Sequence, residues 1–259
     1  MIEIKDLTKQ YGKLTAVDNL TLSIPAGEIF GFIGPNGAGK TTTISMIAGL
    51  LAPTSGSVEI CGIDMLKEPK QAKQNIGYIP DRPYIYEKLT AIEFLQFTAD
   101  LFSMTNSMTK EEFRQRAESQ LKIFSLLDWA DALIESFSHG MKQRLIMAAA
   151  LIHEPKVLVV DEPMVGLDPS AIKMVKQMLI ELADSGTTIF MSTHTLKIAE
   201  DVCDRIGVIH KGKLIAKGSV KELKQQAVLK RQAKNQQHEN GDNVDLEQLF
   251  MMLTESEQI

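Results

Sequence analysis

A glycine-rich loop that ends in lysine and threonine is the sequence feature with the clearest chemistry. Residues 34–41 read Gly-Pro-Asn-Gly-Ala-Gly-Lys-Thr, which fits the phosphate-loop pattern G-x-x-x-x-G-K-[ST]. Glycines let the backbone wrap closely around a phosphate, and the N–H groups at the start of a following helix can bind the anion. The lysine supplies a cation for the β- and γ-phosphates, and the threonine hydroxyl can bind Mg²⁺. We expect phosphate contacts from Gly34, Pro35, Asn36, Gly37, Ala38, Gly39, Lys40, Thr41 and Thr42.

Two adjacent carboxylates, Asp161 and Glu162, are the second feature. They follow an apolar run at residues 157–160. The carboxyl end of a buried parallel strand is where α/β proteins bind ligands, so Asp161 could hold Mg²⁺ through water. Glu162 could orient and polarise an attacking water as a general base. An isolated acidic pair at a strand end is commonly just solvated, but the phosphate loop independently requires a magnesium-binding acid.

Short apolar runs must position these groups. Such runs cover residues 29–33, 157–160, 187–191 and 205–209, and helical patterns cover 41–50, 170–183 and 196–202. A run that is apolar at every position is typical of a strand buried on both faces. Strands that alternate with helices predict an α/β fold with a mainly parallel, helix-covered sheet.

The remaining segments follow other patterns. Apolar and polar residues alternate in the first 24 residues, which predicts half-buried strands. Residues 90–129 show only helical periodicity, as expected of a helical subdomain inserted into the sheet. The polar segment 220–259 predicts a helix, then a linker around 240–243, and then a short amphipathic end at 246–253.

Composition limits the class of protein. The 259 residues carry a formal net charge of −5, which gives no support to nucleic-acid binding by bulk charge. The longest apolar run, residues 145–152, is too short for a membrane span, and the N-terminus has no signal-peptide pattern. Cys61 and Cys203 lie far apart, so they form neither a disulfide framework nor a zinc motif. We therefore expect a cytoplasmic protein.

Further motifs, in a fixed order, resemble the ATP-binding subunits of ABC transporters over residues 1–218. Residues 137–144, Phe-Ser-His-Gly-Met-Lys-Gln-Arg, are similar to that family's signature loop, usually Leu-Ser-Gly-Gly-Gln. Gly-Leu-Asp at 166–168 resembles its D-loop, and His194 its switch histidine. The resemblance implies a P-loop NTPase cassette with an N-terminal antiparallel β subdomain, a helical subdomain inserted at about 82–150 and an extension over 219–259.

The resemblance also implies site roles and partners. Two chains, identical or different, would bind head to tail around two Mg-ATP molecules. Ser138, Gly140 and Asp168 would contact the nucleotide and phosphate loop of the second subunit, and His194 would contact the γ-phosphate. Tyr11 would stack on adenine with Val17 beside it, although Tyr11 could instead be an ordinary strand-end aromatic.

The sequence departs from the family pattern at three positions. Asp81 stands where the family usually has a glutamine that touches the magnesium shell and couples to the membrane subunits. An aspartate could still bind Mg²⁺ through water, but it adds a negative charge near the phosphates. His139 and Met141 replace the usual Gly and Gln of the signature loop. Met-Lys-Gln-Arg at 141–144 resembles the subunits of exporter-type systems.

The leading hypothesis is an ATP-hydrolysing motor subunit that works with a separate integral membrane subunit, peripheral on the inner face of the cell membrane. It would dock around Asp81 and the helical insertion. The alternative is an ABC-type ATPase that acts in translation or DNA maintenance. Such relatives usually have two cassettes, long coiled coils or basic patches, none of which the sequence contains. A GTPase is disfavoured because no Asn-Lys-x-Asp motif is present. The transported substrate and the role of the extension, regulatory, dimerising or merely solvated, stay open.

Overall fold

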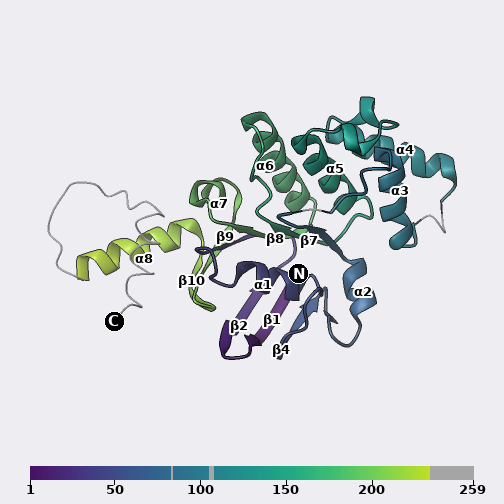
Figure 1. Cartoon of the computed structure of the whole chain (residues 1–259). Helices are drawn as coiled ribbons and strands as arrows, with labels where there is room; N and C mark the ends of the chain where they lie inside the picture. The colour runs from purple at the N-terminus through teal and green to yellow at the C-terminus, as the bar shows by residue number, and fades with distance from the viewer. Residues whose placement is uncertain (83, 105–107, 234–259) are drawn as a thin grey trace.

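Two β-sheets form the body of the molecule (Figure 1). The computed structural model describes residues 1–82, 84–104 and 108–233, with the backbone alone for 227–233. The larger sheet has the strand order β10-β9-β3-β8-β7-β6 and the smaller one β2-β1-β4-β5. The strands of the larger sheet are β3 (Ile29–Ile33), β6 (Ile76–Ile79), β7 (Val157–Asp161), β8 (Thr188–Thr193), β9 (Arg205–His210) and β10 (Lys213–Gly218).

The larger sheet is parallel except at one edge. Strands β6, β7, β8, β3 and β9 pair in parallel, and only β10 runs antiparallel to its neighbour β9. The prediction of a mainly parallel central sheet is therefore confirmed. Strands β3, β8, β7 and β6 are consecutive neighbours, so the residues that follow them meet at one edge of the sheet. The phosphate loop follows β3, Asp81 follows β6, Asp161 ends β7 and His194 follows β8.

Burial on both faces explains the continuous apolar runs. In β7, Val157 and Val159 pack into one hydrophobic core, whereas Leu158 and Val160 pack into a second core on the opposite face. The first core contains α1 (Lys40–Ile47), which lies between the two sheets (Figure 1). The second lies beneath α5 (His139–Leu151) and α6 (Pro169–Asp184), on the other side (Figure 1). Each fully buried aliphatic side chain contributes about 1.5–3 kcal/mol, so the strand is fixed from both sides.

The smaller sheet is antiparallel and confirms the predicted N-terminal β subdomain. Its strands are β1 (Ile2–Tyr11), β2 (Leu14–Ile24), β4 (Ser55–Ile60) and β5 (Ile63–Asp64). Alternate side chains of β2, among them Leu20 and Leu22, are buried toward α1. Cys61 lies half-buried in the turn between β4 and β5, whereas Cys203 is buried beside β3.

Helices fill the segment that the sequence predicts as helical. These are α3 (Ala91–Leu101) and α4 (Lys110–Ile123), followed by short 3₁₀ turns at Leu127–Trp129 and Ile134–Ser136. Thr90 and Thr109 begin the two helices with capping boxes, each pairing the threonine with a glutamate three residues later. Both helices pack against α5, to one side of the larger sheet (Figure 1). The domain boundary at residue 218 and the subdomain limits stay predictions.

Several short elements were not identified from the sequence. They are β4, β5, β6, β10 and α2 (Pro69–Gln74). The two remaining helices, α7 (Leu196–Val202) and α8 (Val220–Ala233), match predicted helical segments. The predicted linker and amphipathic end beyond residue 233 lie outside the described residues. Among the described residues, no helix combines the length and apolar character that crossing a membrane requires.

Candidate active site

The phosphate loop joins β3 to α1, and its glycines are required by geometry. Gly39 has φ +110°, and a Cβ there would lie 2.4 Å from the carbonyl oxygen of Ala16. Gly37 has φ +78°, another conformation that side chains disfavour. Because Gly39 is the N-cap of α1, no side chain caps the helix, and its first-turn N–H groups are left for an anion.

Lys40 is held inside the loop. Its Nζ donates hydrogen bonds to the carbonyl oxygens of Gly34, at 2.7 Å, and Pro35, at 3.2 Å. The side chain is largely buried, and this burial lowers the pKa of Lys40, whereas Glu162 and Asp161 act to raise it. The ammonium group of Lys40 is therefore partly shielded from solvent, with the carboxylates of Glu162 and Asp161 near it.

Asp161 ends β7 and is almost fully buried, with 2% of its surface exposed. It accepts hydrogen bonds from the hydroxyls of Ser192 and Thr41. Burial raises the pKa of Asp161 despite these hydrogen bonds, and the negative charges of Glu162 and Asp81 raise it further. The structure thus brings Thr41 of the phosphate loop to the first acid of the predicted pair.

Glu162 and His194 form a direct pair. The Oε1 atom of Glu162 lies 2.9 Å from Nδ1 of His194, and its Oε2 accepts the His194 backbone N–H at 3.4 Å. The Glu162 backbone has φ +51°, which is uncommon for a residue with a side chain. Its own N–H donates to the backbone oxygen and the hydroxyl of Ser192. Strain of this kind is typical of functional sites.

These groups surround a cavity of about 380 Å³ at the carboxyl end of the parallel strands. Its lining comprises Tyr11, Leu14, Ala16, Asn36, Gly37, Gly39, Lys40, Thr41, Thr42, Asp81, Asp161 and Glu162. Predicted residues from the N-terminal strand, the phosphate loop and the ends of β6 and β7 therefore meet at one place. Gly34, Pro35 and Ala38 shape the loop without lining the cavity.

The structure does not bring Val17 to this cavity. Its side chain is fully buried in the core beneath β2, and the preceding residue, Ala16, lines the cavity instead. Successive side chains of a strand point to opposite faces, so a shift of one residue moves a side chain from the cavity into the core. Leu14 and Ala16 were missed because the alternation set by Leu20 and Leu22 is broken at Asn19, where φ is +51° and the pairing of β1 with β2 shifts register, so the sequence pattern does not identify this face.

The three residues predicted to act on a second subunit lie away from the cavity lining. Ser138 caps α5 by accepting the Met141 N–H at 3.3 Å, and Asp168 caps α6 by accepting the Ser170 N–H at 2.9 Å. The backbone N–H groups of Ala171 and Ser170, which both donate to the Asp168 carboxylate, lower its pKa. Gly140 lies in the first turn of α5, with open space where a Cβ would stand.

Oxygen donors suited to Mg²⁺ are present but incomplete. Thr41 and Asp161 share a hydrogen bond, and Asp81 lines the same cavity. Among the described residues, no group of three or more His, Cys, Asp and Glu side chains is arranged to hold a metal by itself. Mg²⁺ is usually held by one or two carboxylates together with substrate phosphates and water, so this partial donor set fits a metal that arrives with a nucleotide.

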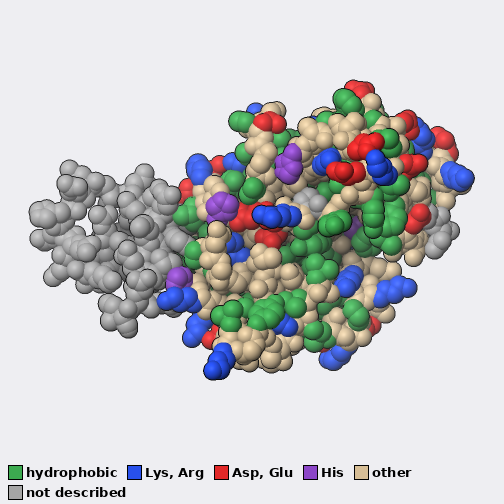
Figure 2. Space-filling model, in the orientation of Figure 1, with side chains coloured by type: hydrophobic (Ala, Val, Ile, Leu, Met, Phe, Trp, Pro, Cys, Tyr) green, Lys and Arg blue, Asp and Glu red, His purple; other side chains and the backbone are tan. Residues whose placement is uncertain are grey.

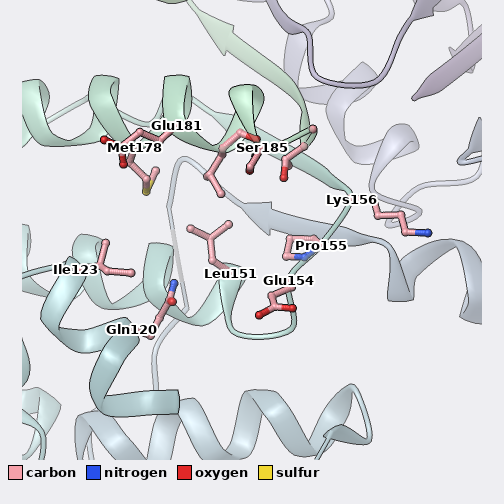
Figure 3. A pocket seen from close by; sticks show the side chains of 12 residues that line it. Gln120, Ile123, Leu151, Glu154, Pro155, Lys156, Met178, Glu181 and Ser185 are labelled. Carbon is pink, nitrogen blue, oxygen red and sulfur yellow. Dashed lines mark hydrogen bonds between the residues drawn. The ribbon is translucent and has the colours of Figure 1, made fainter. Parts of the chain in front are cut away.

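Further cavities lie away from the phosphate loop. A second cavity, of about 480 Å³, lies between α4, α5 and α6, where Ile123, Leu151 and Met178 point toward one another (Figure 3). It includes Lys156 and Thr187, which precede β7 and β8, so it lies at the opposite end of these strands from the phosphate loop. Despite its volume, this cavity is therefore too far from the phosphate loop to belong to the candidate site.

The third, which we call the apolar groove, has a volume of about 300 Å³. Its lining includes Leu50, Pro80, Tyr84, Phe94, Phe102 and His153. Tyr84 is 97% exposed at its edge, and Tyr86 and Phe97 form an exposed edge-to-face pair nearby on the same helical region. Figure 2 shows hydrophobic side chains gathered over α3 on this face of the molecule.

Known protein families and sequences agree with the motifs found at this site. The family profile described as ABC transporter matches residues 17–165. The linearmycin resistance ATP-binding protein LnrL of Bacillus subtilis (strain 168) is 40% identical over 86% of this chain and 70% of its own length. The bacitracin transport ATP-binding protein BcrA of Bacillus licheniformis is 42% identical over 83% of this chain and 68% of its own length.

Solved structures agree with the fold. An ATP-binding subunit of an ABC transporter has a TM-score of 0.85 and 32% identity, covering 98% of this chain and 99% of that chain. A dimeric ATP-binding cassette, in a post-hydrolysis state with ADP and Pi, has a TM-score of 0.78 and 28% identity. It covers 85% of this chain and 99% of that one. The α/β cassette predicted from the sequence is therefore confirmed.

Proposed function

The chain belongs to the ABC transporter family, as an ATP-binding subunit that hydrolyses ATP with Mg²⁺, and from this membership we propose the roles of its residues and its partners. The observation that carries the proposal is the contact between Glu162 and His194 beside the phosphate loop. It supports the proposal because it joins an imidazole to a carboxylate that lines the same cavity as Lys40, and such a pair suits the hydrolysis of a terminal phosphate.

The phosphate loop binds the triphosphate. The free N–H groups at the start of α1 and the ammonium of Lys40 supply donors and positive charge. Thr42 adds a hydroxyl to the lining of the cavity. Tyr11, which is half-exposed beside the cavity, stacks on adenine, and Ala16 extends the contact in place of Val17.

The metal is held by Thr41 and Asp161, with water and phosphate oxygens completing its shell. When bound, Mg²⁺ neutralises charge on the β- and γ-phosphates. Burial and hydrogen bonds from Ser192 and Thr41 fix the Asp161 carboxylate in one orientation. This orientation does not depend on the nucleotide.

Glu162 acts as the general base for hydrolysis. Its carboxylate accepts a proton from a water whose oxygen attacks the γ-phosphorus, while the bond between that phosphorus and the β–γ bridging oxygen breaks. The products are ADP and inorganic phosphate. His194 donates from Nδ1 to the Glu162 carboxylate, and in the imidazolium form, in which both ring nitrogens carry a proton, its Nε2 donates to the γ-phosphate.

A second subunit completes each site. Ser138 and Gly140 at the start of α5 contact the γ-phosphate of nucleotide bound to the other chain, and Asp168 contacts that chain's phosphate loop. Their position outside the cavity of their own chain supports this arrangement, as does the dimeric form of the related cassette. The partner is a second copy of this chain or a related ATP-binding subunit.

The membrane partner is an integral transporter subunit, with this chain on the inner face of the cell membrane. The apolar groove and the adjacent Asp81 offer the docking surface, because exposed aromatic side chains there have no cover in the described chain. The names of LnrL and BcrA concern linearmycin resistance and bacitracin transport, which supports export over a role in translation or DNA maintenance.

The Glu162→Gln variant tests the hydrolytic role. Glutamine keeps the size of the side chain but cannot accept the proton, so we expect turnover to fall by about a thousand-fold or more while ATP still binds. Size-exclusion chromatography with ATP should show a trapped dimer. The control Glu181→Gln, an exposed change on α6 away from the site, should keep normal turnover. Near-normal hydrolysis by Glu162→Gln would contradict the assignment.

A further inference from the structure

The proposed nucleotide site holds more negative than positive side chains. Asp81, Asp161 and Glu162 line the cavity, and Lys40 is the one Lys or Arg among its described lining residues. A carboxylate repels a triphosphate, and in a partly buried site water screens this repulsion poorly. An anion could therefore enter only with help from a cation or from the loop's N–H groups.

Asp81 differs from the other two carboxylates. Asp161 is held by Ser192 and Thr41, and Glu162 is held by His194. Asp81 has 45% of its side chain exposed, and the ion pair described for it is with Arg82 at 3.9 Å. The Arg82 side chain is 96% exposed, and a pair of this kind is worth little because solvent screens it. Of the three carboxylates that line the cavity, Asp81 is thus the one with the weakest described partner.

The charge of Asp81 extends into the cavity. Asp81 lines the same cavity as Lys40, Thr41 and Asp161, so its charge acts on any group that binds beside the phosphate loop. Asp81 repels any phosphate bound at the loop, and it attracts any divalent cation bound beside those phosphates. One side chain therefore has opposite effects on the two forms of a nucleotide.

We propose that Asp81 makes this site discriminate between metal-complexed and metal-free nucleotide, by repelling the bare triphosphate and attracting its cation. The inference rests on the proposed nucleotide site. A glutamine at this position, as in the family pattern, would lack the charge and hence most of the discrimination. Direct ligation by Asp81 is not required, because a charge acts through intervening water.

Equilibrium binding of a fluorescent, non-hydrolysable ATP analogue tests the proposal. The dissociation constant is measured in EDTA and again with saturating Mg²⁺. The constant in EDTA divided by the constant with Mg²⁺ measures the preference for metal-complexed nucleotide. Removing one charge by Asp81→Asn or Asp81→Gln should lower this ratio about ten-fold, mainly by tightening binding in EDTA. Raising the salt concentration should reduce the difference between wild type and variants. The control Asp131→Asn removes one charge from an exposed residue of the helical region and should leave the ratio unchanged.

The possible results distinguish failure of the proposed nucleotide site from failure of the proposed role of Asp81. A wild-type chain that binds no analogue even with Mg²⁺ would overturn the proposed nucleotide site itself. Wild-type binding with an unchanged ratio in both Asp81 variants would overturn the role of Asp81 alone. An equal change in the Asp131 control would also overturn it, because net charge would then be the cause. Thermal unfolding of each variant establishes that the binding data come from folded protein.

Discussion

Glu162 shows how backbone and side chain act together at the scale of the residue. Its positive φ turns the chain sharply after β7, and its N–H is tied to Ser192 on the neighbouring strand. The carboxylate is therefore directed toward His194 and away from the buried Asp161. Two adjacent acids thus differ in environment, one suited to a metal and the other to a proton.

Lys40 gives the first residue-scale prediction. Replacing Lys40 with alanine removes the cation and the bonds that link the loop carbonyls of Gly34 and Pro35. We expect ATP affinity to fall at least about a hundred-fold, because a charge-assisted contact in a partly buried site is lost. Titration with a fluorescent ATP analogue measures this loss.

The control is Lys13→Ala, an exposed lysine in the turn between β1 and β2, which should bind ATP normally. Unchanged affinity in Lys40→Ala would remove the basis for assigning the phosphate loop.

At the scale of the residue, the sequence predicts which motif residues gather at the cavity better than it predicts which face of a strand each residue lies on. Lys40, Thr41, Asp161 and Glu162 line one cavity, as expected, because strand–loop–helix geometry fixes the spacing of their motifs. Val17 was placed wrongly with respect to the cavity because only strand register separates it from Ala16. The role of Ser192, which links Asp161 and Glu162 across two strands, depends on a pairing between β7 and β8 that no local pattern reveals.

At the scale of the element, α5 presents its N-terminus to the surface. Ser138 caps it, and the first turn carries no acidic side chain, so the helix dipole there is uncompensated. We expect Ser138→Arg to keep ATP binding but lose at least about ten-fold of the hydrolysis rate, because a bulky cation would block a second subunit's nucleotide. Steady-state phosphate release measures the effect.

Loss of the cap alone must be separated from the loss of contact with the second subunit. Ser138→Ala removes the cap, which costs about 1 kcal/mol of stability, and should retain more activity than Ser138→Arg. Ser185→Arg makes the same change at the end of α6 and should be fully active. Wild-type hydrolysis by Ser138→Arg would argue against catalysis across subunits.

His153 predicts how stability depends on pH. It follows α5, stacks on Phe102 with ring centroids 3.6 Å apart, and contacts the Ile76 carbonyl at 3.0 Å. Burial lowers its pKa from 6.5 to about 4. Between these values the unfolded chain binds a proton that the folded chain does not, so stability is lost as pH falls from about 6.5 to about 4.

Replacing His153 with phenylalanine should remove this part of the acid sensitivity, about 1–3 kcal/mol after allowance for partial exposure. Urea unfolding at neutral and acidic pH measures it. His139→Asn, a change at an exposed histidine, should retain the wild-type pH dependence. An identical acid loss in His153→Phe and wild type would contradict the assignment.

The elements that the sequence predicted are those with strong periodicity. Strands β3, β7 and β8 were identified because they are buried on both faces, and α6 because its apolar face is sustained over four turns. Strands β4 and β10 are largely half-exposed, and β6 has four residues, so their patterns resemble those of loops. Their pairing partners in the sheets decide their structure.

At the scale of the whole molecule, β6 links two functional regions. Tyr78 and Pro80 line the apolar groove, and Asp81 lines the nucleotide cavity. A partner bound in the groove would thus contact the same short segment that adjoins the metal position. The continuity of these residues supports coupling between the proposed membrane subunit and the site.

The groove can be tested through co-purification. Tyr84→Asp adds a charge to an almost fully exposed side chain, so folding should be unaffected. We expect the variant to bind ATP normally yet to lose the integral membrane protein that accompanies the wild-type chain from detergent-solubilised membranes. Leu66→Asp, a change at a half-exposed leucine that does not line the groove, should keep it. Equal recovery of the membrane protein by both variants would place the docking surface elsewhere.

The cysteines give the chain a built-in reporter. Cys203 is buried beneath β3, where its Sγ would lie 2.7 Å from a Cβ on Gly31, and burial raises the pKa of its thiol. Cys61 is half-exposed in the smaller sheet, and the sequence contains no third cysteine. A maleimide dye should therefore label each folded molecule once, without mutagenesis. Energy transfer between two such dyes would then report, in real time, each meeting and separation of two subunits.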